Sequence, residues 1–171
     1  MSPQTIVRLK ITSVHLIPDA ITGFVGLPCD RSWNIGEKRP KTTIVEQKNG
    51  WILNSCMPKS AMLETQLDEL LNRLRPYQTR LKSLSETECV ELSCVIYANS
   101  PPALNFGDAV IVELGQLGAS LDIDLYLIPD EELKGAGSNG TAELMNREVG
   151  AQRGEEKVSG TVYMAHPGNS F

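Results

Sequence analysis

Three stretches of the chain, residues 5–14, 90–97 and 120–128, alternate between apolar and other side chains. A period of two predicts half-buried β-strands, because successive side chains of a strand point to opposite faces of a sheet. We therefore expect an apolar core face and a polar outward face. The outward set consists of Arg8, Lys10 and Thr12, then Glu91, Ser93 and Tyr97, and finally Asp122, Asp124 and Tyr126.

Helical spacing appears in three other segments. Apolar residues recur every three or four positions from Leu63 to Leu84, which predicts a long helix with Ser60 as its N-cap. Pro76 should kink or restart that helix, because proline removes one helical hydrogen bond. Shorter helices are expected over residues 18–25 and 107–116.

A hairpin is predicted between the first two helices. Residues 42–47 are rich in β-branched side chains and predict a strand, and residues 51–54 should form its partner. Asn49-Gly50 between them is a typical tight-turn pair.

The element order is therefore β-α-β-β-α-β-α-β. It predicts an α+β fold with a mixed or mainly antiparallel sheet and helices packed on one face. Residues 1–129 should form a single domain. Residues 130–171 are Gly-rich and polar, which predicts a flexible tail in which residues 161–164 could form a short strand.

Composition narrows the classes of partner. The chain has 171 residues, 41% of them hydrophobic, and a net charge of −5. The longest basic cluster is the short run from Lys38 to Lys41, so nucleic acid is not an expected partner. No apolar run approaches the ~20 residues of a membrane span, and no secretory signal is visible, so the prediction is a cytoplasmic protein without membrane contact.

The four cysteines contain no CxxC pair, and the prediction is free thiols, mostly buried, without a metal or cofactor.

The first candidate site is the outward sheet face. It is either a solvated surface held by cross-strand charge pairs or a polar surface that receives a partner. The second is the loop that holds Arg31 and Trp33, together with Trp51. Arg and Trp are frequent in binding hot spots, but the two indoles could equally close one end of the core.

The pair Asp122 and Asp124 is a third candidate. Two carboxylates on one side of a strand can divide acid and base roles or hold a divalent cation. Hard cations need more oxygen ligands than two, so exposed strand carboxylates are the competing interpretation.

Several segments, in order, resemble a known family: ITGFVGLP from Ile21, Arg31-Ser32-Trp33, the leucine-rich helix, ELSCVIY from Glu91 and LGQLGASLDIDLY from Leu114. Together they are similar to the small bacterial proteins of domain of unknown function 4279, over roughly residues 6–128. The resemblance implies a compact α+β domain of bacterial type and supplies no activity, cofactor or catalytic residue.

The expected function is non-enzymatic: a cytoplasmic protein-binding domain of the immunity or inhibitor type, using the outward face or the Arg31/Trp33 loop. The alternative is a small metal-dependent or acid/base enzyme that uses Asp122 and Asp124. Self-association through an edge strand is a third alternative.

Overall fold

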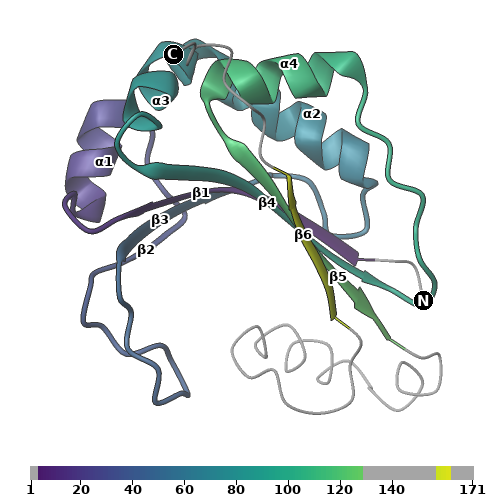
Figure 1. Ribbon diagram of the computed structural model, residues 1–171, viewed down its shortest axis with the longest axis horizontal. Helices are drawn as coiled ribbons and strands as arrows, with labels where there is room; N and C mark the ends of the chain where they lie inside the picture. The colour runs from purple at the N-terminus through teal and green to yellow at the C-terminus, as the bar shows by residue number, and fades with distance from the viewer. Residues whose placement is uncertain (1–3, 129–156, 163–171) are drawn as a thin grey trace, which may run out of the picture.

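The protein is built on one sheet that helices cover on a single face, as the computed structural model shows for residues 4–128 and 157–162 (Figure 1). The six strands lie in the order β2-β3-β1-β4-β5-β6. Only β4 and β5 run parallel; all other neighbours are antiparallel. The predicted α+β class with a mixed sheet is confirmed. The strands are β1 (Gln4–Ser13), β2 (Arg31–Trp33), β3 (Asn49–Asn54), β4 (Cys89–Ala98), β5 (Ser120–Leu127) and β6 (Lys157–Val162).

Four α-helices form the second layer. Pro76 lies in a 3-10 turn (Arg75–Tyr77) that separates the second helix from the third, so the predicted restart is confirmed. Ser60 is not the N-cap; Met62 takes that position without a side-chain hydrogen bond. The helices are α1 (Pro18–Val25), α2 (Leu63–Leu74), α3 (Gln78–Leu84) and α4 (Asp108–Leu117).

The core lies between the helices and one set of alternating strand residues. The predicted alternation holds: apart from Ile6 and Val95, the apolar positions of β1, β4 and β5 face the helices, and most are fully buried. Burial of this apolar surface is the main force that holds the two layers together. The fully buried residues include Leu9 and Ile11 of β1, Leu92 and Cys94 of β4, and Leu67, Leu70 and Leu74 of α2.

One buried polar side chain completes the sheet. β3 ends opposite Arg8, so the first residues of β1 have no strand beside them there. The amide of Gln66, from α2, fills this place: its Oε1 accepts a hydrogen bond from the Val7 N–H (3.2 Å) and its Nε2 donates to the Thr5 carbonyl (3.0 Å). Buried backbone groups need such partners, so Gln66 is a structural residue.

The predicted hairpin is wrong. Asn49 and Gly50 are not a turn but the first residues of β3, which pairs with β1 and with β2. Gly50 is required for close packing, because a Cβ there would lie 2.0 Å from the Trp33 ring. A glycine selected for close approach has the same sequence signature as one selected for a turn.

Residues 34–48, here called the arm, extend from the sheet on the side away from the helices (Figure 1). Only an isolated bridge, Lys38 with Val45, remains of the strand predicted at 42–47. The Arg39 guanidinium binds the Glu46 carboxylate with two contacts (2.5 and 3.2 Å), which joins the two sides of the arm.

The predicted tail is described only in part. β6 (Lys157–Val162) pairs with β5 and lies at the edge of the sheet, beginning four residues before the short strand expected at 161–164. The prediction that the rest of 130–171 is flexible concerns residues outside those that the structure describes.

Candidate binding site

The side of the sheet opposite the helices, here called the open face, collects nine of the ten residues predicted to bind. Strand register sets this arrangement: Arg8 pairs with Ser93 and Ser93 with Asp122, while Arg31, Ile52, Lys10 and Glu91 form the next row. In each row all side chains point to the same face. The nine residues are Arg31 and Trp33 of β2, Arg8 and Lys10 of β1, Glu91 and Tyr97 of β4, and Asp122, Asp124 and Tyr126 of β5.

Trp51 is the exception: of the two interpretations given for it, a binding residue or part of the core, the structure supports the core. It lies in β3 between Gly50 and Ile52, so alternation turns it towards the helices, where it is fully buried. Its indole N–H donates to the Thr22 hydroxyl of α1 (3.0 Å), which satisfies the polar atom inside the core. Trp51 is therefore a core residue that fixes α1 on the sheet.

The open face has two halves of opposite charge. Arg31, Arg8 and Lys10 lie on β2 and β1, whereas Glu91, Asp122 and Asp124 lie on β4 and β5. The Lys10 ammonium and the Glu91 carboxylate form an ion pair (3.0 Å) where the halves meet. A partner bound here would meet a positive and a negative surface side by side, which fixes its orientation.

Trp33 is held in place at the β2 edge. Its indole N–H donates to the Lys48 carbonyl (3.0 Å), its ring covers Gly50, and the Arg31 guanidinium lies 5.6 Å from the ring centre. Arg31 itself is exposed. The predicted pair of Arg and Trp is thus preorganised for contact, with its ring fixed and its charge accessible.

Two tyrosines, near the C-terminal ends of the parallel strands β4 and β5, form a second fixed element of the open face. The rings of Tyr97 and Tyr126 stack with their centres 5.1 Å apart and an interplanar angle of 17°. Ser93 and Val95 belong to β4, the strand between β1 and β5. Both side chains face the open side and are nevertheless buried. The centre of the open face is therefore packed, and its exposed parts are the longer side chains around it.

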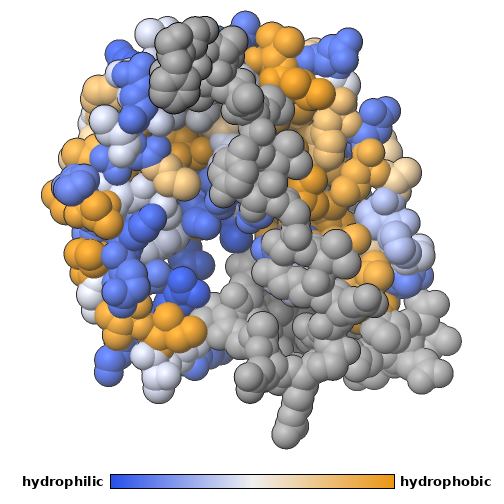
Figure 2. Space-filling view, in the orientation of Figure 1, coloured by the Kyte–Doolittle hydropathy of each residue, from blue (hydrophilic) through white to orange (hydrophobic). Residues whose placement is uncertain are grey.

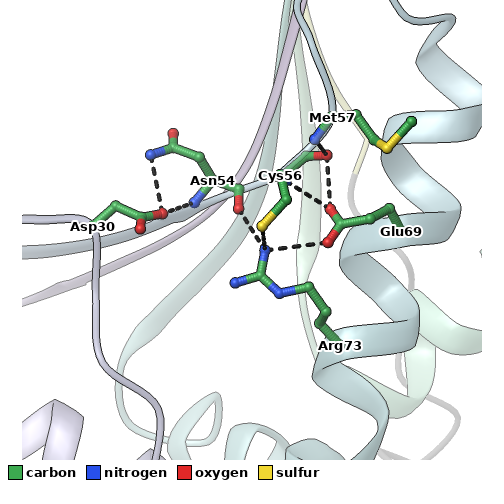
Figure 3. A network of polar contacts seen from close by, with 7 residues as sticks. Asp30, Asn54, Cys56, Met57, Glu69 and Arg73 are labelled. Carbon is green, nitrogen blue, oxygen red and sulfur yellow. Dashed lines mark hydrogen bonds and ion pairs between the residues drawn. The ribbon is translucent and has the colours of Figure 1, made fainter.

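A polar network fixes the end of β3 beside the open face (Figure 3). The Glu69 carboxylate of α2 accepts hydrogen bonds from the Ser55 hydroxyl (2.8 Å) and the Cys56 N–H (2.9 Å), and Arg73 donates to Glu69 (3.3 Å) and to the Asn54 carbonyl (2.9 Å). Partial burial raises the pKa of Glu69, but these hydrogen bonds and the Arg73 charge outweigh it, and the pKa lies below its ordinary value.

The cysteines differ in how far they are buried. Cys94 is fully buried, and burial, together with the nearby Asp122 charge, raises the pKa of its thiol to about 12 against the opposing effect of Arg8. Cys89 and Cys56 are exposed, so the expectation of mostly buried thiols is wrong. Strand parity explains Cys89, which is on the same strand as Cys94 but five residues away and on the opposite face.

Asp122 and Asp124 lie together on the open face, two residues apart on β5. Within residues 4–128 and 157–162 no group of three or more His, Cys, Asp or Glu side chains is arranged to hold a metal ion. Both aspartates take part in contacts with neighbouring groups. Their arrangement therefore supports a charged surface more directly than a metal centre.

Residues 3–128 match the model of a family described as a domain of unknown function (DUF4279). The chain belongs to this family. The DUF4279 domain thus contains β1 to β5 and all four helices, and β6 lies beyond it. Comparison with curated proteins and with solved structures found no significant match. No helix in the described part of the DUF4279 chain is long and apolar enough to cross a membrane.

Sequence reasoning missed the arm and several open-face residues. Ile52 and Asn54 of β3 are next to Arg31 and Arg8 on the open face, but the wrong hairpin hid their orientation. One signal was present for Gln66: it is a polar residue three positions after Leu63 and four before Leu70, on the buried stripe of α2.

Proposed function

We propose that this protein is a non-enzymatic binding domain that holds a protein partner against its open face, in the manner of an inhibitor or immunity protein. One observation supports this most: a sheet face that none of the described helices covers carries two arginines, a tryptophan, two tyrosines and three carboxylates. Arg, Trp and Tyr are the residue types that dominate protein-binding hot spots.

Preorganisation supports the same proposal. Trp33 and the stacked pair Tyr97–Tyr126 are already held in place by neighbouring groups. Rigid aromatic side chains lose little conformational entropy when a partner binds, so more of the contact energy appears as affinity. The two charged halves add orientation and a faster association with a partner of complementary charge.

The arm enlarges the surface beside the sheet. It exposes Ile35 (52%), Ile44 (40%) and Val45 (37%), while the Arg39–Glu46 pair keeps it folded. Figure 2 shows hydrophobic residues on this lower-left part of the molecule among hydrophilic ones. Exposed apolar side chains on an ordered projection supply the hydrophobic contact that a polar sheet face lacks.

A matched pair of variants tests the proposal. Thr12→Arg places a large cation on the open face, whereas Thr79→Arg makes the same change on an exposed position of α3. The full chain and each variant are used as bait in lysate of the native host, and bound protein is quantified relative to bait. We expect one partner at near-stoichiometric amount with the parent and with Thr79→Arg, and a loss of tenfold or more with Thr12→Arg.

Three results would count against this function. One is the absence of a stoichiometric partner; another is a partner retained by Thr12→Arg. The third is loss only in Thr79→Arg, which would place docking on the helix side, where Ile111 and Val112 of α4 are exposed. The inhibitor role requires in addition that the purified chain lowers the partner's own activity.

The enzyme alternative has its own test. Thermal unfolding is measured with Mg²⁺, Mn²⁺ and Zn²⁺, since a bound ion raises the melting temperature by mass action. A saturable rise that Asp122→Asn abolishes would favour the metal-dependent enzyme over the binding domain.

A further inference from the structure

A hollow of about 390 Å³ lies at the basic half of the open face, where β3 ends beside β1. Its size is within the range of small-molecule sites. Open-face residues of three strands form its floor, and the segment after β3 forms its rim; they include Arg8 of β1, Arg31 of β2, Asn54 of β3 and Lys59.

The charges around the hollow have one sign. Arg8, Arg31 and Lys59 line it, and none of the described residues that line it is acidic. Two carboxylates are bonded to residues of its rim: Asp30 accepts from the Asn54 N–H (2.7 Å), and Glu69 binds Ser55 together with Cys56 and Arg73. A concave site whose described lining has three cations and no acidic residue favours an anion, and a guanidinium matches the two oxygens of a carboxylate in particular.

The remaining walls are partly polar, with Thr5, Ser55 and Gln66, and partly apolar. Ile6, Ile52 and Met57 also line the hollow, and Ile52 is almost fully buried. An ion that is small and fully hydrated, such as phosphate, would leave these walls without a contact. A carboxylate attached to a short hydrocarbon chain satisfies both the charge and the apolar surface.

The hollow is preformed. The Glu69–Arg73 network fixes residues 54–57 of the rim (Figure 3), and Gln66 closes the edge of β1 behind it. A preformed site binds without first ordering a loop, which reduces the cost of binding. Arg8 and Lys59 also take part in interactions with other groups.

We infer that this hollow binds a small organic carboxylate with an apolar body. This inference goes beyond the protein-binding proposal and does not depend on it, because the purified chain alone is sufficient to test it.

The test uses hexanoate, its neutral counterpart hexanamide and inorganic phosphate, each titrated at constant ionic strength while thermal unfolding and the heat of binding are measured. We expect a saturable rise in melting temperature with hexanoate only. Arg31→Gln and Lys59→Gln should each weaken hexanoate binding about tenfold or more, since each removes a charge-assisted contact. Lys48→Gln, an exposed cation of the arm that does not line the hollow, is the matched control and should leave the affinity unchanged.

Four outcomes would overturn the inference: no saturable response to hexanoate, an equal response to hexanamide, an equal response to phosphate, or hexanoate affinity unchanged in both lining variants. Arg31 and Lys59 are exposed, so their variants should fold, and the melting curve without ligand verifies this. Failure of the partner experiment leaves these outcomes unaffected, because no partner is present.

Discussion

The two faces of the sheet are made by the same strands and differ in almost every other respect. On the helix face, alternate residues of β1 and β4 are apolar and buried under the helices, with Leu9 and Leu92 fully excluded from water. On the open face, the other alternate residues of the same strands include the charged pair Lys10 and Glu91. A displacement of one residue along a strand therefore separates a side chain that stabilises the fold from one that is available to a partner.

This difference predicts that chemistry and stability can be changed separately. Substitutions on the helix face should lower the free energy of unfolding, and substitutions on the open face should alter contacts with little loss of stability. The following experiments examine this separation, beginning with the largest expected effect.

Thiol reactivity should differ most between the faces. Cys94 has a pKa of about 12 and is buried, whereas Cys89 on the same strand is exposed. Alkylation requires the thiolate, so iodoacetamide at about pH 8 should modify Cys94 roughly a thousandfold more slowly than an ordinary exposed thiol. Mass spectrometry of peptides after brief treatment measures this ratio. Comparable modification of Cys94 and Cys89 in the folded chain would show that β4 is not oriented as described.

Neighbouring residues of β4 should have unequal effects on stability. Leu92→Ala opens a cavity in the core and should cost about 2–5 kcal/mol of unfolding free energy. Glu91→Ala removes only the partly exposed pair with Lys10 and should cost about 1 kcal/mol or less. Urea unfolding followed by circular dichroism compares them. Equal losses would contradict the separation of the two faces.

Gln66 provides a test at the border of the core. Gln66→Met retains the volume but leaves the Val7 N–H and the Thr5 carbonyl without this partner. Because each unsatisfied buried group costs about 1–3 kcal/mol, we expect a loss of about 2 kcal/mol or more. Gln78→Met, which removes an exposed bond to Gln116, is the matched control and should change stability by about 0.5 kcal/mol or less. Similar losses in both variants would show that Gln66 does not complete the sheet.

The smallest expected effect is on the loss of stability at acidic pH. The folded-state pKa of Glu69 is lowered, so its stabilising contribution is present above the ordinary carboxyl pKa and is lost as pH falls through the folded value. Melting temperatures measured from about pH 7 down to about pH 3 should therefore fall less steeply in Glu69→Gln than in the parent chain. Glu64→Gln, an exposed change on the same helix, is the charge-matched comparison. A parent and a Glu69→Gln chain with parallel pH profiles would contradict the Glu69 network.

Sequence alone determined the local features of this protein. The alternation in residues 5–14, 90–97 and 120–128 assigned each side chain to its face, and helical spacing located α1 and the restart at Pro76, because both periods are properties of the backbone over a few residues. The same alternation was sufficient to group the charged residues of β1, β4 and β5.

Tertiary structure decided which strands are neighbours. Asn49-Gly50 could form a turn or a strand, and only the packing of Trp33 on Gly50 selects the strand. This pairing points Trp51 towards the core. It also places Ile52 between Arg31 and Lys10 in one row of the sheet, and it leaves the hollow at the end of β3. Such pairings depend on residues far apart in the chain, and their energies are therefore absent from any local pattern.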